Sequence, residues 1–151
     1  MKKPHEAYND ADPFILNRFL EAQIRNYEIA LSELKRGCKE SHWMWFVFPQ
    51  IIGLGSSSTS EFYAVKNKKE ARAYLNHAIL GSRLSVCTNI LLNLRGLSSL
   101  DIFGYPDNLK FCSSMTLFEF VDLEDSLFSK ALDQYCGGQR DERTLKIIGS
   151  D

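Results

Sequence analysis

The chain has 151 residues, 44% of them hydrophobic and 25% charged, which is typical of a folded globular domain and excludes general disorder. Its 18 basic and 19 acidic residues give a formal net charge of −1, without the basic excess of a nucleic-acid-binding domain, so we expect no nucleic acid partner. The longest apolar run, Trp43 to Pro49, is far shorter than the roughly 20 residues that cross a bilayer, so we expect no membrane association.

The first predicted element is a helix that begins at Asp12-Pro13. Asp can cap free amides, and Pro suits the first helical position. Apolar residues then recur at three- and four-residue intervals, and Gly37 supplies the C-terminal stop. Residues 1–11 are polar and have no period, so we expect a flexible tail ahead of a single helical domain over residues 12–151.

The next segment, Ser-His-Trp-Met-Trp-Phe-Val-Phe-Pro-Gln over residues 41–50, is apolar on every side and is expected inside the protein. Periodicity cannot separate a buried helix from a buried strand over residues 42–48, and both stay open. We favour a helix that Ser41 caps and Pro49 ends. A loop rich in Gly and Ser follows over residues 51–60 and leads into a helix around Thr59 to Lys66.

Helices are expected over the rest of the chain as well. Asn67 should cap one through Leu75, and another should run from the break near His77 to Gly96. The remaining segments are a short turn from Ser98 or Ser99 to Phe103, a helix from Leu109 to Val121 with Leu109 in the core, one from Asp122 or Glu124 to Tyr135, and one from Asp141 to Ile148. The predicted fold class is therefore all-α, a compact bundle of about seven or eight helices, several of them short.

The four cysteines, Cys38, Cys87, Cys112 and Cys136, lie far apart in the sequence. They form no C-x-x-C pair, and no nearby histidines complete a metal site, so we expect neither a metal nor a cofactor. The N-terminal residues do not resemble a signal peptide. These features predict free thiols and a cytoplasmic location.

Two segments concentrate residues that could bind a ligand. Residues 41–60 combine two tryptophans with a Gly-x-Gly-Ser loop, and such rings and loop amides can hold a planar group and an anion. Residues 107–116 add Lys110, Ser113, Ser114 and Thr116. Each segment also has a plainer interpretation, as a loop after a buried anchor and as hydroxyls that satisfy exposed amides. No nucleophile or paired-histidine motif is present, so no reaction is predicted and His42 is the one candidate catalytic residue.

The acidic residues lie mainly on polar helix faces, where we expect them to be solvated.

Residues 41–50, 53–56, 71–75, 80–84 and 110–118 closely resemble the domain-of-unknown-function family numbered 1810. The resemblance extends from Asp12 to Gly149 and implies a compact, mostly α-helical domain without an established activity. Some members are labelled calpastatin, a disordered inhibitor, which does not fit this packed-core pattern. The sequence departs from the family at Ala78, where Pro is common, and at Cys112, where a polar residue is expected.

The resemblance gives a reason to join the two segments into one pocket. The predicted ligand-binding residues are His42, Trp43, Trp45, Gln50, Ser56, Tyr63, Lys110 and Ser114. In this hypothesis the aromatic rings wall a cavity, and the loop amides hold the anionic group of a small or nucleotide-like ligand. One alternative is a non-enzymatic module that binds a protein or associates with itself, and another is a structural domain whose aromatic run is only its core.

Overall fold

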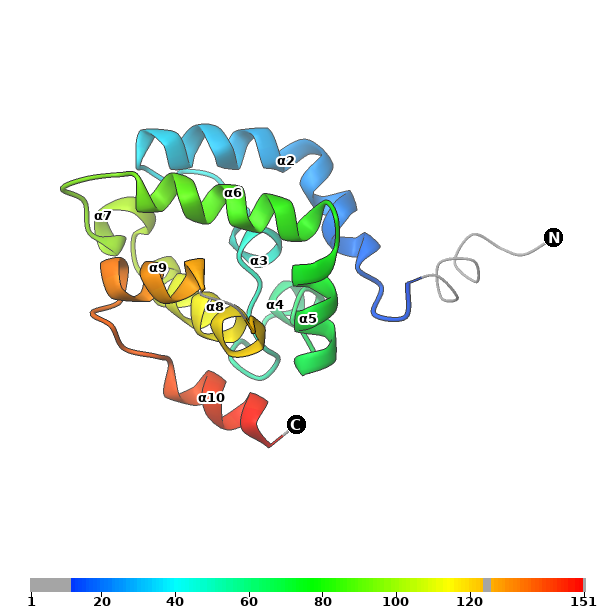
Figure 1. The fold of residues 1–151 in the computed structure, drawn as a ribbon. Coiled ribbons are helices and arrows are strands. Elements are labelled where there is room, and N and C mark those ends of the chain that lie inside the picture. Colours follow the sequence, from blue (N-terminus) through cyan, green and yellow to red (C-terminus); the bar gives the residue numbers. More distant parts are fainter. Residues whose placement is uncertain (1–11, 124–125, 151) are drawn as a thin grey trace.

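The computed structural model describes residues 12–123 and 126–150, which form nine helices around one apolar core (Figure 1). These ranges contain no β-strand, only an isolated bridge between Ile51 and Val65. The predicted all-α fold is confirmed, and the helices slightly exceed the expected number because several are single short turns. In the same ranges no helix is both long and apolar enough to cross a membrane. The tail predicted over residues 1–11 lies outside the described residues.

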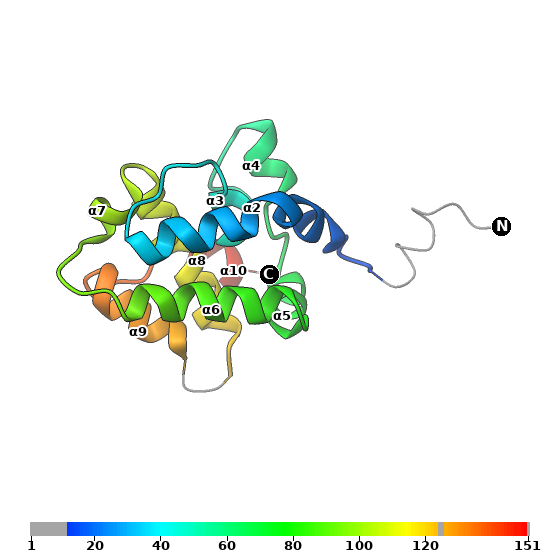
Figure 2. The same ribbon diagram turned by 90° about the horizontal axis from the view of Figure 1, so that it is seen from above.

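The long helix α2 (Asn17–Arg36) packs along α6 (Leu80–Leu92) on one side of the molecule (Figures 1 and 2). The carboxylate of Asp12 accepts hydrogen bonds from the amides of Leu16 and Asn17, at 2.7 and 2.8 Å. The predicted start at Pro13 is wrong, because the intervening residues form turns before the helix begins. Gly37 ends the helix as predicted, in the left-handed conformation at φ 72°.

The buried segment over residues 42–48 is a short helix, α3 (Met44–Val47), that packs against α2. Ser41 does not cap it, because the Ser41 hydroxyl donates instead to the carboxylate of Glu33 on α2. That buried carboxylate also accepts hydrogen bonds from the amides of Glu40 and Ser41 and from the Trp43 indole, at 2.8, 2.9 and 2.8 Å. Glu33 thereby fixes the loop that leads from α2 into α3.

Two predicted helix starts are confirmed by their caps: Asn67 accepts from the Glu70 amide before α5 (Lys68–Asn76), and Asp141 accepts from the Thr144 amide before α10 (Glu142–Gly149). The segment from Ser98 to Phe103, predicted as a short turn, is instead a short helix, α7 (Ser99–Phe103), whose cap Ser98 accepts from the Asp101 amide. Ser57 caps α4 (Ser58–Phe62), which begins close to the helix expected around Thr59 to Lys66 but ends four residues before Lys66. The start predicted for α9 (Leu127–Tyr135) at Asp122 is wrong, because Ser126 caps it; Glu124 lies outside the described residues.

Helix α8 (Asp107–Val121) lies at the centre of the core and contacts α3, α5, α7, α9 and α10. Phe111, Met115 and Phe118 are fully buried along it. Leu109, predicted in the core, is 53% exposed because it lies on the first turn of α8 at the molecular surface. Helix α8 therefore presents its first turns to solvent and its middle to the core.

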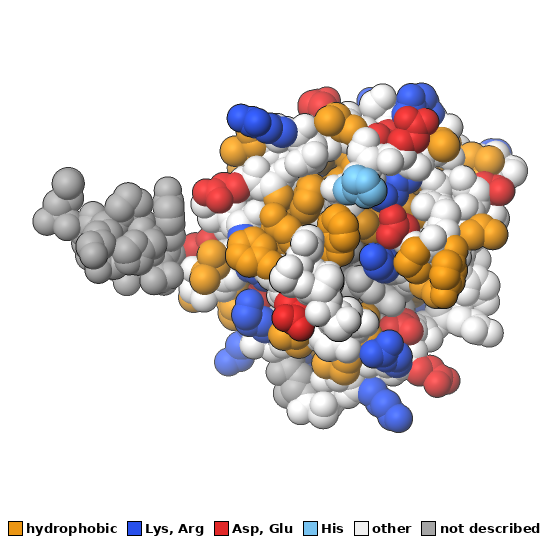
Figure 3. Space-filling model, turned by 180° about the vertical axis from the view of Figure 1, so that it is seen from behind, with side chains coloured by type: hydrophobic (Ala, Val, Ile, Leu, Met, Phe, Trp, Pro, Cys, Tyr) orange, Lys and Arg blue, Asp and Glu red, His pale blue; other side chains and the backbone are white. Residues whose placement is uncertain are grey.

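Acidic and basic side chains are dispersed over the face of the molecule in Figure 3. Within residues 12–123 and 126–150, however, two acidic residues are buried, which corrects the expectation of solvated carboxylates for them. Glu33 accepts its hydrogen bonds from the loop before α3 and from the Trp43 indole. Glu70 pairs with Arg18 at 2.6 Å, with both side chains buried. The Arg18 guanidinium also donates to the carbonyls of Phe62 and Ala64. Buried charges occur in this way only where a partner compensates their lost hydration.

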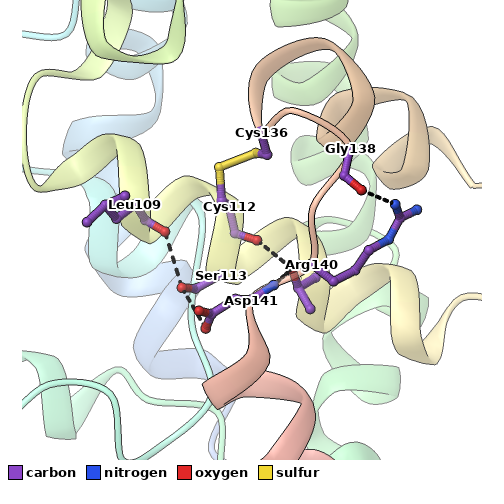
Figure 4. The surroundings of a disulfide bond; sticks show 8 residues. Leu109, Cys112, Ser113, Cys136, Gly138, Arg140 and Asp141 are labelled. Atoms are coloured by element: carbon purple, nitrogen blue, oxygen red, sulfur yellow. Dashed lines mark hydrogen bonds between the residues drawn. A yellow bond between two sulfur atoms is a disulfide. The ribbon is translucent and has the colours of Figure 1, made fainter.

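Cys112 on α8 and Cys136 after α9 form a disulfide with a Cα–Cα distance of 6.0 Å (Figure 4). The prediction that all four thiols are free is therefore wrong for this pair. The two residues are 24 positions apart, and only the packing of α9 on α8 brings them together. Cys38 and Cys87 are free thiols, exposed and buried respectively. Free thiols were one reason to expect a reducing compartment, and the disulfide removes that reason.

Candidate functional site

An open groove of about 660 Å³ lies where three segments meet: the Gly-Ser loop, the start of α8 and the start of α10. Trp45 and Gln50 line it together with residues 54–57 of the loop. From the other segments it is lined by Tyr105, Pro106, Leu109, Lys110, Ser113, Asp141 and Arg143. The groove thus combines aromatic rings, hydroxyls and charges of both signs.

Lys110 and Trp45 form the most specific contact in this groove. The ammonium nitrogen of Lys110 lies 5.3 Å from the centroid of the Trp45 ring, within cation–π range. Trp45 is half-buried, although its neighbours Met44 and Phe46 are buried. Part of the indole therefore stays accessible beside a cation.

Asp107 sets the charge around Lys110. One carboxylate oxygen of Asp107 lies 3.6 Å from the Lys110 ammonium, and the other lies 2.8 Å from the ammonium of Lys39. Lys39 in turn lies 5.2 Å from the Trp43 ring centroid. The shorter contact with Lys39 leaves Lys110 the more available of the two cations.

The loop before α4 offers hydrogen-bond donors without protein partners. In the described part of the chain, no protein acceptor is found for the backbone N–H groups of residues 55–59. The same holds there for the Ser56 hydroxyl, the Gln50 amide group and the Trp45 indole N–H. Gly53 has a φ of 98°, in the region that favours glycine, which lets the loop turn toward α10. Such donors are available to water or to an anion.

Helix α10 closes one side of the groove. The guanidinium of Arg143, on the first turn of α10, donates to the Gly53 carbonyl at 3.2 Å. Asp141, the α10 cap, accepts hydrogen bonds from the Thr144 amide and hydroxyl and from the Ser113 hydroxyl. These contacts join α10 to both the loop and α8.

The sequence matches, over residues 13–148, the family described as "Protein of unknown function (DUF1810)". The chain belongs to this family. A crystal structure of the conserved hypothetical protein Rv1873 from Mycobacterium tuberculosis is similar: it is 46% identical, with a TM-score of 0.90, and the match covers 91% of this chain and 99% of that chain. No protein with a curated description matches the sequence. Membership in the DUF1810 family thus fixes the fold but brings no activity with it.

Within this DUF1810 fold, some of the predicted site residues meet in the groove. Trp45, Gln50, Ser56 and Lys110 line it, from segments far apart in the sequence. Tyr63 lies nearby and lines a small cavity of about 20 Å³ together with Trp45 and Gln50. Residues from both segments that were predicted to bind a ligand, 41–60 and 107–116, therefore line the groove.

His42, Trp43 and Ser114 do not line the groove. Trp43 has no exposed surface, because its indole donates to Glu33 inside the core. Ser114 is also fully buried, and its hydroxyl has no protein partner in the described residues. His42 is exposed. These three residues therefore lie outside the candidate site.

Sequence reasoning missed Tyr105 and Arg143. Tyr105 is 76% exposed at the turn before α8, and the one signal in the sequence was an aromatic residue directly before a proline. Arg143 lies on the last helix, and only the fold brings it to the Gly-Ser loop. Nothing local in the sequence distinguishes it from other surface arginines.

Proposed function

We propose that the groove binds a small anionic ligand that carries a planar ring, such as a nucleotide-like molecule. The observation that supports this most is the Lys110 ammonium beside the partly exposed Trp45 ring, next to a loop of unpaired amides. A ring can stack on Trp45 or Tyr105. The anionic group can bind to Lys110, Arg143 and the loop amides.

The charges around the groove favour a ligand of low charge. Among the residues that line the groove, Lys110 and Arg143 are basic and Asp141 is acidic, which leaves one net positive charge. This balance matches a single phosphate or carboxylate better than a polyphosphate, whose additional negative charges the Asp141 carboxylate would repel. The proposed ligand class therefore carries one anionic group, a single phosphate or a carboxylate. The proposal includes no catalytic step, since His42 does not line the groove.

A thermal-shift panel of nucleotides, sugar phosphates and nicotinamide derivatives tests this proposal. A ligand at about a hundredfold over its dissociation constant adds roughly 2.7 kcal/mol of stability. For a domain of this size that corresponds to a rise in Tm of about 5–10 °C. Monophosphates should give the larger shifts and triphosphates the smaller ones, measured without divalent metal. If no member of the panel raises Tm, the proposal fails.

A protein-interaction or self-association module is the second candidate. It is favoured by two large exposed side chains at the groove, Tyr105 at 76% and Leu109 at 53% exposure. Sedimentation of the chain at increasing concentration tests self-association directly. A dimer that Tyr105→Ser and Leu109→Ser abolish would favour this candidate over the ligand site.

A further inference from the structure

The disulfide lies directly behind the Arg143 side of the groove. Cys112 is in α8, next to Ser113, which lines the groove, and Cys136 is the residue at which α9 ends. Residues 137–141 lead from Cys136 to the cap of α10 (Figure 4). The disulfide thus ties the start of this connection to the helix that forms part of the groove.

Hydrogen bonds link the far end of the same connection to the turn of α8 that carries Cys112. The Asp141 amide donates to the Thr116 hydroxyl at 3.0 Å, and that hydroxyl donates to the Cys112 carbonyl at 2.8 Å. The Ser113 hydroxyl donates to the Asp141 carboxylate at 3.1 Å (Figure 4). Both ends of residues 136–141 are therefore held on one turn of α8.

Asp141 connects the anchored residues 136–141 to the groove. It caps α10, and Arg143 follows on the first turn of that helix with its hydrogen bond to the Gly53 carbonyl. The Arg140 guanidinium pairs with Glu119 and provides a second anchor for the connection. Because this anchor remains without the disulfide, loss of the disulfide should loosen α10 locally and should not unfold the domain.

A reductant can reach the disulfide from solvent. A second open hollow of about 560 Å³ is lined by both Cys112 and Cys136, and each is partly exposed. This hollow shares Leu109, Ser113, Asp141 and Arg143 with the groove. The bond and the proposed ligand site are therefore adjacent parts of one surface.

We infer that the Cys112–Cys136 disulfide regulates the groove: the oxidised form holds Arg143 in place for ligand, and the reduced form releases it. This inference rests on the proposed function. The reductant is a dithiol. One of its thiolates attacks a cysteine sulfur, forming a mixed disulfide and releasing the other cysteine as a thiolate, which takes up a proton. The second thiol of the reductant then displaces the remaining cysteine, so the protein gains two electrons and two protons, and the reductant leaves as a disulfide.

Hydrogen exchange of the oxidised and dithiol-reduced full chain tests the structural part. Amides of residues 139–147 should exchange at least about fivefold faster in the reduced chain, whereas those in the middle of α2 should not change. The double variant Cys112→Ser/Cys136→Ser should reproduce the reduced pattern without reductant. Cys38→Ser, which removes an exposed free thiol, is the matched control and should respond to dithiol like the parent chain. Equal exchange in the oxidised and reduced chains overturns the inference.

Titration with adenosine 5′-monophosphate and with inorganic phosphate separates this inference from the proposed function. Tighter binding to the oxidised chain, by about fivefold or more, supports both. Equal affinity in the two redox states overturns the inference and leaves the proposed function standing. Binding to neither state, for these probes and for the wider panel, ends the proposed function and with it the regulation of ligand binding.

Discussion

The ammonium group of Lys110 lies 5.3 Å from the centroid of the Trp45 ring, although the two residues belong to segments far apart in the chain. This contact brings together the aromatic run before the Gly-Ser loop and the first turns of α8. It also sets a cation beside an accessible ring in a groove that contains unpaired donors. An anion with a planar ring is the ligand for which such a combination is suited.

Replacing Lys110 should weaken ligand binding without weakening the fold. Lys110→Ala removes a charge-assisted contact, and we expect the dissociation constant of adenosine 5′-monophosphate to rise about tenfold. Lys130→Ala, on the exposed face of α9, is the matched control and should bind as the parent chain does. Isothermal titration measures both. An unchanged constant for Lys110→Ala would remove this residue from the site.

Ser114→Ala tests whether the buried Ser114 hydroxyl contributes to stability. The Ser114 hydroxyl is buried without a protein partner in the described residues, so its removal should leave the free energy of unfolding unchanged or raise it by about 1 kcal/mol. Ser113→Ala, one position earlier, loses its bond to Asp141 and should cost about 1 kcal/mol. Urea unfolding gives both values. A clear loss of stability in Ser114→Ala would indicate a partner for its hydroxyl.

Glu33 should make stability depend on acid pH. Burial by itself raises the pKa of this carboxyl, but hydrogen bonds from Ser41, the Glu40 amide and Trp43 outweigh burial and lower the pKa from 4.5 to about 2. Because the folded pKa lies below the unfolded one, the stabilisation is complete above about pH 5 and is lost as the pH falls toward 2. Its size is on the order of 2–3 kcal/mol. The free energy of unfolding measured between pH 2.5 and 7, about the range that this linkage covers, should fall toward the acid end.

Glu33→Gln is the control for this effect. The variant should be less stable at neutral pH, and its stability should vary less with pH between about 2.5 and 5 than that of the parent chain. If both proteins lose stability in parallel over that interval, other carboxyls carry the pH dependence and the role given to Glu33 is wrong.

Reduction of the Cys112–Cys136 disulfide should lower thermal stability. The cross-link spans 24 positions, for which loop closure accounts for about 3 kcal/mol. The corresponding fall in Tm is about 6–12 °C for a domain of this size. Calorimetry with and without a dithiol measures it, and Cys38→Ser should show the same fall. Identical melting of the oxidised and reduced chains would mean that the cross-link does not constrain the unfolded state.

Local signals were enough to predict the fold class. The caps Asn67 and Asp141 and the stop at Gly37 act on their own helices, so the sequence around each one reveals it. The start of α2 was predicted too early because turns separate Asp12 from the helix, and the start of α9 was wrong because Ser126 caps it in place of Asp122. The disulfide escaped prediction since it depends on how α9 packs on α8.

The site could be predicted only in part, because neighbouring residues of the same type point in different directions. Trp43 and Trp45 lie in a run that is apolar on every side, so its pattern does not tell which ring stays accessible. A distant carboxylate decides this, since Glu33 holds the Trp43 indole in the core. Likewise, the side chains of the adjacent residues Ser113 and Ser114 point about 100° apart around the axis of α8. Ser113 therefore lines the groove, whereas Ser114 lies in the core.

The two tryptophans allow the most direct test of the proposed ligand site. The Trp45 indole N–H has no protein partner among the described residues, whereas the Trp43 indole is bound to Glu33 in the core. In a ¹H–¹⁵N titration with adenosine 5′-monophosphate, the Trp45 indole signal and the amide signals of residues 53–57 should shift together while the Trp43 indole signal stays fixed. Shifts confined to other parts of the molecule, or no shifts at all, would contradict a ligand site in this groove.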